Sequence, residues 1–504
     1  MRRFKKSVLL LCTAVMIGTS AGCAKEVAQN DYLDTKAGYD KELFYQNLGT
    51  IQAADPSVIT IGDTFYLYAT NAEATENCNY ICAWSSKNLT DWTLEGKVFI
   101  PDRDAWAVNT LWAPEVIEAD GRYYMYYSGY NLSTSEMGIG VAVSDSPTGP
   151  FHEIEGTFGG KTYSKGEQPI NLGFPTIDAS PFIDDDGSVY LYVSQDQVEN
   201  QSSVFACKLD KDMVTVLSVT EKPLIEPSQE WENPTAGKTW NEAPFVFKKD
   251  GRYYLTYSAN YYTNSNYSIG LAVSDNPLSG FQKVAYNPIL EANPDWTYIS
   301  GTGHNSFFQS PDGKELWIAY HSHIDTVNGG SERKINFDKV SFDGEGRLLV
   351  QGPSITPQVL PSGVSEYENI AAKATVSATK AEGTALLTDD IINYLYDDMG
   401  TYEYVSEGTN KITFSYEEAK SIKAIMVYDS ADYRLAGREA TVKAGGHSFE
   451  LKFNPDYCYV DEYGFEMKMP GSAAILEFEE FEADEITFTF KGNVNLNEIV
   501  ILGK

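Results

Sequence analysis

The stretch APEVIEADGRYYMYYSGYNLSTSEMGIGVAVSDSPTGPF, at residues 113–151, decides the fold because it occurs twice. Residues 243–281 read APFVFKKDGRYYLTYSANYYTNSNYSIGLAVSDNPLSGF, with the same order of apolar strand, glycine turn and aromatic strand. Self-similarity at a fixed period is the sequence signature of a repeat architecture. Weaker copies of the unit begin at three further places, ADPSVITIGDTFYLYAT (54–70), DASPFIDDDGSVYLYVS (178–194) and HNSFFQSPDGKELWIAYHS (304–322).

Each of these five copies predicts a β-hairpin followed by a further strand. A glycine turn between two apolar runs is a strong hairpin signal, and the turn residues are Gly62, Gly121, Gly187, Gly251 and Gly313. The unit period is about sixty residues, and no helical pattern interrupts it. Four-stranded units repeated around an axis form a β-propeller. The sequence therefore predicts an all-β fold with a five-bladed β-propeller at residues 46–362.

A second domain is expected after the repeats, because 504 residues exceed the size at which one hydrophobic core stops growing. The repeats stop in a stretch that contains Pro353, Pro357 and Pro361. Short alternating strands follow at residues 411–416, 421–428, 440–443, 448–453, 474–478, 485–490 and 498–501. Their number and length predict a β-sandwich at residues 366–504.

The first residues are typical of an export signal. Four basic residues precede an apolar run at residues 8–17, and small residues stand directly before Cys23. This pattern resembles a bacterial lipobox, which implies a lipoprotein signal peptide at residues 1–22, a lipid anchor on Cys23 and a linker at residues 23–45. A signal that is simply cleaved remains the alternative, because Ser20 stands where such motifs usually have leucine. Either reading places the mature chain in the cell envelope or outside the cell.

The acidic balance excludes several classes of partner. Removal of residues 1–22 would take away four basic and no acidic side chains and lower the net charge from −33 to −37. Such a surface repels nucleic acid and anionic lipid headgroups. We therefore expect a neutral or weakly charged substrate and no nucleic-acid partner. Membrane contact is expected only through the lipid anchor on Cys23.

The start of each blade's first strand indicates where the chemistry lies. These strands line the central channel of a propeller, so residues at their starts meet at one mouth. Read blade by blade, the position holds Asp55, Trp112, Asp178, Glu242 and His304. Carboxylates crowded in a channel raise one another's pKa unless they are separated or paired. Such tuning is what acid–base catalysis needs.

The motifs around these positions resemble glycoside hydrolase family 43. In blade order they are Ala54-Asp55-Pro56-Ser57, Trp112-Ala113-Pro114-Glu115, Ile177-Asp178-Ala179-Ser180-Pro181, Asn241-Glu242-Ala243-Pro244 and Gly301-Thr302-Gly303-His304-Asn305-Ser306. The resemblance implies hydrolysis of glycosides with inversion, with Asp55 as the general base and Glu242 as the general acid. It implies that Asp178 orients the acid and tunes its pKa, and like-charge repulsion from Asp178 would keep Glu242 protonated. Inversion needs the base and the acid about 6.5–9.5 Å apart, with space for a water.

Four further residues are candidates for the site. The family resemblance implies that His304 lies near a calcium or other ion held largely by water, and a purely hydrogen-bonded role is an equal alternative. It also implies that Arg333 contacts the bound sugar. Trp112 and Trp240 are candidate sugar platforms, because aromatic faces bury the C–H side of a sugar ring. For Trp240, core packing is an equal alternative.

Other polar residues and loops receive less specific expectations. His321 and His323 alternate on one strand and so share a face. They could touch the site or fill a polar seam, and the seam is the favoured reading. Glu115 is expected to turn away from the channel. Segments 156–174 and 228–240 are expected to rim the pocket, and their shape decides between exo and endo action.

The C-terminal domain resembles the discoidin-like sandwich of many carbohydrate-binding modules. The resemblance comes from Glu368-Asn369-Ile370-Ala371, Ala385-Leu386-Leu387-Thr388-Asp389-Asp390 and Val494-Asn495-Leu496-Asn497-Glu498-Ile499. Sugar binding and a structural role both remain open. The candidate loop aromatics are Tyr394, Tyr396 and Tyr402.

Together these features predict an inverting glycoside hydrolase that acts on pentose-rich plant polysaccharide or oligosaccharide. An α-L-arabinofuranosidase or arabinanase is the first expectation, and a β-xylosidase is the alternative. A catalytically inactive surface glycan-binding lipoprotein would be expected to lack at least one of the three acids. We expect a monomer that requires no cofactor, with room for a structural or active-site calcium ion in the propeller channel.

Overall fold

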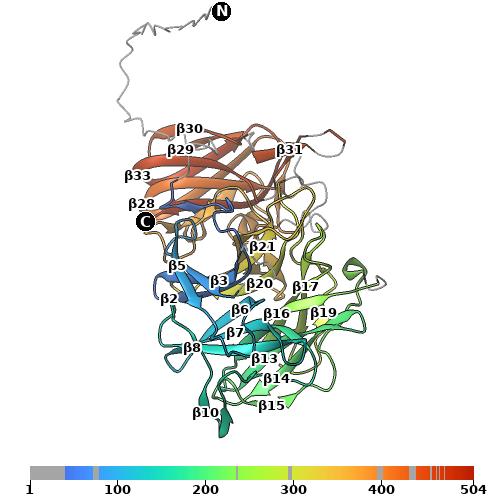
Figure 1. The fold of residues 1–504 in the computed structure, drawn as a ribbon. Coiled ribbons are helices and arrows are strands. Elements are labelled where there is room, and N and C mark those ends of the chain that lie inside the picture. Colours follow the sequence, from blue (N-terminus) through green and yellow to red (C-terminus); the bar gives the residue numbers. More distant parts are fainter. Residues whose placement is uncertain are drawn as a thin grey trace, which may run out of the picture.

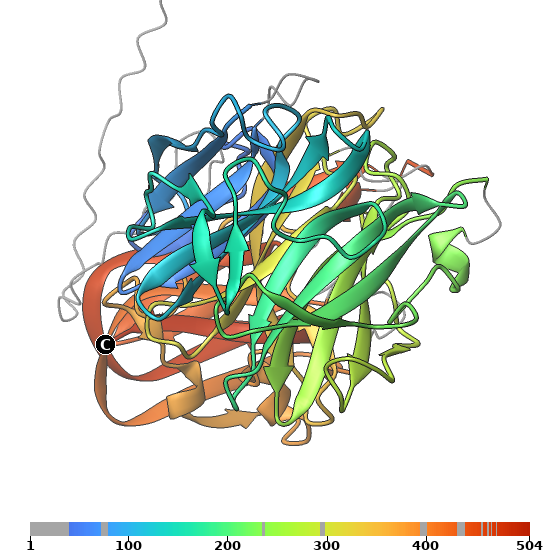
Figure 2. The same ribbon diagram turned by 60° about the horizontal axis from the view of Figure 1, so that its bottom comes forward.

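The computed structural model describes residues 40–504, apart from 72–78, 234–236, 293–297, 394–400, 431–438, 455–456, 461–462, 465 and 470. Five four-stranded antiparallel sheets surround one axis, and an eight-stranded sheet forms the C-terminal part. Figure 1 shows this C-terminal part, in orange and red, packed against the propeller, and Figure 2 shows the blades from below. The all-β class, the five-bladed propeller and the second β-domain are therefore confirmed. The signal peptide and Cys23 lie outside the described residues.

The blades follow the chain in order, and each contains four consecutive strands. Blade one has β2 (Ala53–Ile61), β3 (Thr64–Asn71), β4 (Ile81–Ser86) and β5 (Trp92–Phe99). Blade two has β6 (Trp112–Ala119), β7 (Arg122–Asn131), β8 (Glu136–Ser144) and β9 (His152–Glu153). Blade three has β12 (Thr176–Ile183), β13 (Val189–Val198), β14 (Gln201–Leu209) and β15 (Val216–Val219). Blade four has β16 (Asn241–Lys249), β17 (Arg252–Ala259), β18 (Ser268–Ser274) and β19 (Gln282–Lys283). Blade five has β20 (Gly303–Gln309), β21 (Leu316–His323), β22 (Arg333–Phe342) and β23 (Leu348–Val350).

The aromatic second strands are buried on both faces, which is why the blades stack around an axis. Successive strand residues point to opposite faces, yet Tyr126 and Tyr127 of β7 are both fully buried. Tyr126 packs in the core shared with blade three, and its hydroxyl donates to the carbonyl oxygen of Met213 at 2.5 Å. Tyr127 packs in the core shared with blade one, with its ring 4.7 Å from that of Phe99.

A ring of backbone irregularities joins the starts of the first strands. In every blade the pairing of the first strand with the second skips two residues there. One residue of each bulge has positive φ, namely Asp55, Ala113, Asp178, Ala243 and His304. The N–H of each such residue donates to a side chain on the second strand of the preceding blade. In blade order the acceptors are Nδ1 of His321 and the hydroxyls of Thr70, Ser128, Ser194 and Ser258.

This ring corrects the expected alignment of the blades. Ala113 and Ala243 are the equivalents of Asp55, so the expectation that Trp112 and Glu242 share its strand position was wrong. Trp112 and Glu242 each lie one residue before the position that is equivalent to Asp55. A bulge re-aims side chains that regular pleating would send to opposite faces, and both Asp55 and Glu242 line the same pocket.

The C-terminal domain is built around two long bent strands. They are β28 (Asn410–Asp429) and β33 (Ala473–Phe490), which pair along most of their length with shifts of register in the middle. The sequence predicted four separate strands here. The remaining strands of this sheet are β25 (Glu368–Asn369), β26 (Thr375–Ala378), β27 (Tyr404–Ser406), β29 (Glu439–Ala444), β30 (His447–Lys452) and β34 (Val494–Gly503). A separate pair is formed by β31 (Cys458–Val460) and β32 (Glu466–Lys468).

Alternate residues of β28 show how this domain attaches to the propeller. Ile425 and Val427 lie in the core of the sandwich, whereas Met426 and Tyr428 pack on its outer face with Phe44. Phe44 belongs to β1 (Phe44–Tyr45), which pairs with β24 (Gln358–Val359). The last residues of the expected linker therefore form a strand against the segment that leaves the propeller.

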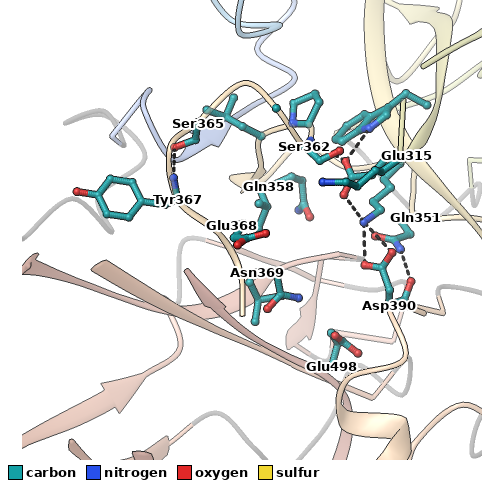
Figure 3. Close-up of a pocket in the computed structure, with 18 of the residues that line it drawn as sticks. Glu315, Gln351, Gln358, Ser362, Ser365, Tyr367, Glu368, Asn369, Asp390 and Glu498 are labelled. Atoms are coloured by element: carbon teal, nitrogen blue, oxygen red, sulfur yellow. Dashed lines mark hydrogen bonds and ion pairs between the residues drawn. The ribbon is translucent and has the colours of Figure 1, made fainter. Parts of the chain in front are cut away.

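The boundary between propeller and sandwich encloses a polar cavity of about 530 Å³. Figure 3 shows Glu315 of the propeller and Asp390 of the sandwich on its wall. Nζ of Lys339 bridges the two carboxylates, at 2.7 Å from an oxygen of each. Nearby, the hydroxyl of Tyr402 donates to Asp343 at 2.9 Å. Tyr402 is therefore a buried contact between domains, and its expected role as an exposed loop aromatic was wrong; Tyr394 and Tyr396 lie outside the described residues.

We predict that Lys339→Met lowers the free energy of unfolding by about 2 kcal/mol, because two carboxylates then face each other with no cation between them. Thermal unfolding monitored by calorimetry measures the effect. Lys314→Met is the matched control, since Lys314 pairs with Asp312 while its own side chain is 74% exposed. Equal changes in the two variants would contradict a stabilising role for the bridge.

Candidate active site

A pocket of about 360 Å³ opens at the mouth of the propeller channel. We call it the channel pocket. All seven residues predicted for the site line it: Asp55, Asp178, Glu242, Trp112, Trp240, Arg333 and His304. They come from all five blades and from the segment before blade four. The expected meeting of three acids at one mouth is therefore what the fold produces.

Asp55 is surrounded by the guanidinium of Arg333, two imidazoles and a hydroxyl donor. Its Oδ1 lies 3.0 Å from Nη1 of Arg333 and 3.2 Å from Nδ1 of His304, and its Oδ2 accepts a hydrogen bond from Thr70 at 2.7 Å. Burial alone would raise the pKa of Asp55, but the guanidinium of Arg333, together with the imidazoles, outweighs it and holds this pKa well below 3.8. Asp55 is therefore an ionised carboxylate at neutral pH.

His321 belongs to this group, so the alternative that it touches the site holds for this residue, and the favoured polar seam was wrong. Its Nδ1 lies 3.2 Å from the backbone N and 3.3 Å from Oδ1 of Asp55, and its side chain is fully buried. Burial and the charge of Arg333 lower the pKa of His321 to about 3, so the ring is neutral. His323 does lie in a seam, where its ring nitrogens contact Ser300 and the carbonyl of Tyr262.

Glu242 lies in the opposite electrostatic environment. Burial raises its pKa to about 8, the Tyr267 hydroxyl that donates to Oε1 at 2.9 Å lowers it in part, and the charge of Asp55 raises it further. A carboxyl group with this pKa is protonated at neutral pH. Asp55 and Glu242 therefore offer a proton acceptor and a proton donor to the same pocket.

The pKa values of Asp178 and Glu242 depend on each other. Burial raises the pKa of Asp178 to about 7, and the charges of Glu242 and Asp55 add to the rise. The expected repulsion between Asp178 and Glu242 is thus present, and burial is the main cause of the raised pKa of Glu242. Oδ2 of Asp178 accepts the N–H of Ala243 at 3.1 Å, which fixes it beside the strand that contains Glu242. Both carboxyl groups have raised pKa values, so the pair holds a proton at neutral pH.

An aromatic wall borders the pocket near blade four. The rings of Trp240 and Tyr261 lie 4.8 Å apart, and Tyr262 stacks beneath the guanidinium of Arg333 at 4.8 Å. Trp112 and Trp240 are both partly exposed. A partly exposed ring on the wall of a pocket is a surface for a sugar, so the structure favours the platform reading of Trp240 over core packing.

A buried ion pair supports the strand that contains Glu242. Nζ of Lys283 lies 2.5 Å from Oε1 of Glu232 and donates to Oδ1 of Asn241 at 2.8 Å. Glu232 also accepts a hydrogen bond from Tyr257 at 2.7 Å. Glu232 is in the 3-10 helix η1 (Glu230–Glu232), so this network ties the segment before blade four to the residue that directly precedes Glu242.

The predicted rim segment at residues 156–174 lies away from the channel pocket in its first part. The hairpin of β10 (Gly156–Phe158) and β11 (Lys161–Tyr163) packs on the turn between β14 and β15, where Thr215 bonds to the carbonyl of Phe158 and to Tyr163. That turn is at the end of blade three opposite the channel pocket, so the expectation for this part of segment 156–174 was wrong. Glu115 is outside the pocket and accepts a hydrogen bond from Ser57 at 3.2 Å.

Comparison with known proteins identifies the family. Residues 48–347 match Glycosyl hydrolases family 43. The chain belongs to this family. A thermostable family-43 glycoside hydrolase of known structure is 36% identical and superposes with a TM-score of 0.56, over 63% of this chain and 99% of its own. The present family 43 protein is therefore a glycoside hydrolase.

Curated relatives of this family 43 enzyme act on several glycosides. A "Beta-D-galactofuranosidase xynD" of Aspergillus niger is 26% identical over 59% of this chain and 81% of its own length. An "Extracellular exo-alpha-(1->5)-L-arabinofuranosidase" of Streptomyces avermitilis is 27% identical over 55% of this chain and 58% of its own length. The match thus spans little more than half of the second relative.

Sequence reasoning missed several residues of the family 43 site. Thr70 and His321 accept the N–H of a bulge residue, and the repeats contain a signal for them, because serine occupies the corresponding place in the other blades. His321 therefore replaces a hydroxyl at a fixed repeat position. Tyr267, Tyr261 and Asp196 also line the pocket. They lie outside the aligned first strands, and no motif distinguishes them.

Proposed function

We propose that this family 43 enzyme is an inverting glycosidase of pentofuranosides in plant polysaccharide, with α-L-arabinofuranosides as the preferred substrate. The observation that supports it is the contrast between two acids in one pocket. Asp55 is ionised beside Arg333, and Glu242 is protonated by burial. The relative named for exo-arabinofuranosidase activity supports the sugar. A β-xylosidase is the second candidate.

In the proposed mechanism Asp55 accepts a proton from the water that attacks the anomeric carbon. Glu242 donates its proton to the glycosidic oxygen as the bond breaks, so the sugar leaves with inverted configuration. Asp178 keeps the strand of Glu242 in place through the N–H of Ala243. Arg333 orients the base and lies where it can also contact the bound sugar.

The test is a substrate screen with the purified full chain. We expect the highest kcat/KM on an aryl α-L-arabinofuranoside, compared with an aryl β-D-xyloside and an aryl β-D-galactofuranoside. Proton NMR during turnover should show the inverted anomer appearing first. Preference for the xyloside would favour the second candidate. Hydrolysis of none of the three would support an inactive glycan-binding protein.

The pH profile of kcat/KM follows from the two pKa shifts. Glu242 acts as the protonated acid, so activity should fall as pH rises through about 8. Asp55 acts as the carboxylate, so activity should fall only when pH drops below its lowered pKa, itself well under 3.8. We therefore predict a broad plateau on the acid side of neutrality, measured with an aryl glycoside. A decline in kcat/KM as pH falls through about 5 would contradict the assignment of Asp55 as the base.

We propose that the chemistry requires no metal. In the described part of the chain, no three His, Cys, Asp or Glu side chains form a group that could hold an ion. Direct coordination of calcium at His304 does not fit, because its Nδ1 already faces Asp55 and calcium takes six to eight oxygen ligands. An ion near His304 would be held by water. After treatment with EDTA we expect kcat/KM within about twofold of its original value, and a large loss that calcium restores would contradict this.

Export, the lipid anchor on Cys23, the monomeric state and sugar binding by the C-terminal domain stay predictions. Relatives named as extracellular support the proposed place outside the cell. Within the described ranges, no helix has the length and apolar character of a membrane-spanning segment. Labelling with a lipid precursor, compared between the natural chain and Cys23→Ala, tests the anchor.

A further inference from the structure

Asp196 is an acid of the channel pocket for which neither motif nor mechanism provides a role. It lies near the end of β13, two residues beyond Ser194, whose hydroxyl accepts the N–H of Ala243. Residues two apart on a strand point to the same side. Asp196 therefore faces the start of blade four, one pleat further toward the pocket mouth, and it lines the pocket beside Glu242.

Its carboxylate has acceptor capacity that the protein leaves unused. The backbone N–H of Asp196 donates to Pro175, but the side chain makes no hydrogen bond or ion pair with any residue that the structure describes. Lys238 acts on it only as a charge at longer range, and burial raises its pKa. Asp55, by contrast, already contacts Arg333, two imidazoles and Thr70. A half-buried carboxylate without donors is an unfilled acceptor for a ligand.

The position of Asp196 on β13 shows on which side of the pocket it lies. Ser194, two residues earlier on the same strand, contacts Ala243, which directly follows Glu242, and the charge of Asp196 raises the pKa of Glu242. Asp196 is thus on the side of the acid. In an inverting reaction the acid stands beside the departing oxygen and the base stands on the opposite face of the sugar. The paired rings of Trp240 and Tyr261 also line the pocket, and Trp240 lies two residues before Glu242 in the chain.

We propose that Asp196, with the platform of Trp240 and Tyr261, forms the binding site for the leaving-group sugar. The inference rests on the proposed function. Asp196 accepts hydrogen bonds from hydroxyls of that sugar, while the two rings cover its C–H face. The ligand class is a glycoside whose leaving group is itself a sugar, which makes the enzyme selective for oligosaccharide over simple aglycones. A site built to bind a hydroxyl discriminates strongly against a group that lacks one.

The test compares two substrates that share the sugar identified in the screen. One is the disaccharide or trisaccharide, and the other is the aryl glycoside, which has no leaving-group hydroxyls. Both are measured at pH 5, where Glu242 remains protonated in every variant. For Asp196→Ala we expect the ratio of kcat/KM on oligosaccharide to kcat/KM on aryl glycoside to fall by about tenfold or more, because a hydrogen bond to a sugar hydroxyl is lost. Asp186→Ala, in an exposed turn of the same blade, is the control.

A second variant separates loss of folding from loss of contact. Asp196→Asn keeps the shape and one acceptor oxygen, so its ratio should lie between those of the natural chain and Asp196→Ala. An equal fall on both substrates would overturn the proposal, because Asp196 would then act through Glu242. A ratio that stays within about threefold of the natural one would also overturn it. If the natural chain hydrolyses neither substrate, the proposed function fails instead.

Discussion

Asp55→Asn is expected to lower kcat/KM by about 10²–10⁴-fold, the contribution of a positioned general base. The loss should be the same on aryl glycosides and on oligosaccharides. The attacking water must lose its proton whatever the leaving group is, and an amide cannot accept that proton at neutral pH. Steady-state kinetics with both substrate types measure the effect.

The asparagine variant keeps the shape of the site but leaves Arg333 without its carboxylate. We therefore expect a modest fall in melting temperature, because a buried cation has lost its counter-charge. Near-ultraviolet circular dichroism should be unchanged. Asp63→Asn, in the exposed hairpin turn of the same blade, is the control. If Asp55→Asn retained more than about a tenth of the activity, Asp55 would not be the base.

Repetition explains how much of this fold could be predicted. Five copies of a hairpin with both faces apolar can bury those faces only by stacking around an axis, so local patterns determined the global arrangement. The strands of the C-terminal sandwich were predicted less accurately. The sequence breaks at 416–421 and 478–485 indicated strand ends, but β28 and β33 continue through them because the two strands pair with each other on both sides of the shift of register.

As with the fold, some residues of the site were predictable from local motifs, whereas others depend on contacts between distant parts of the chain. The three acids were predictable because each belongs to a motif at a repeated position. The strand position of Glu242 was misaligned by one residue because the sequence does not show which residue of a bulge has positive φ. Tyr267, Asp196 and the pKa values depend on burial and on contacts between blades. Those contacts exist only once the ring has closed.

Glu242→Gln should separate substrates that Asp55→Asn treats alike. Glutamine cannot donate a proton to the departing oxygen, so we expect oligosaccharide hydrolysis to fall by about 10³-fold or more. A dinitrophenyl glycoside leaves as a stable anion and needs little protonation, so its loss should be at least about tenfold smaller. Loss of the acid should also remove the decline in activity near pH 8, since that decline reports the ionisation of Glu242.

The expected pattern for Glu242→Gln distinguishes a general acid from a residue that only shapes the pocket. A shaping residue would affect both leaving groups equally and would leave the alkaline limb in place. Glu118→Gln is the matched control, because Glu118 is exposed on the first strand of blade two. Tyr267 provides an internal check. Its hydroxyl lowers the pKa of Glu242, so Tyr267→Phe should move the alkaline limb to higher pH while Glu242→Gln abolishes it. A limb that persisted in the glutamine variant would assign the proton to another group, and Asp178, with a pKa near 7, would be the next to replace.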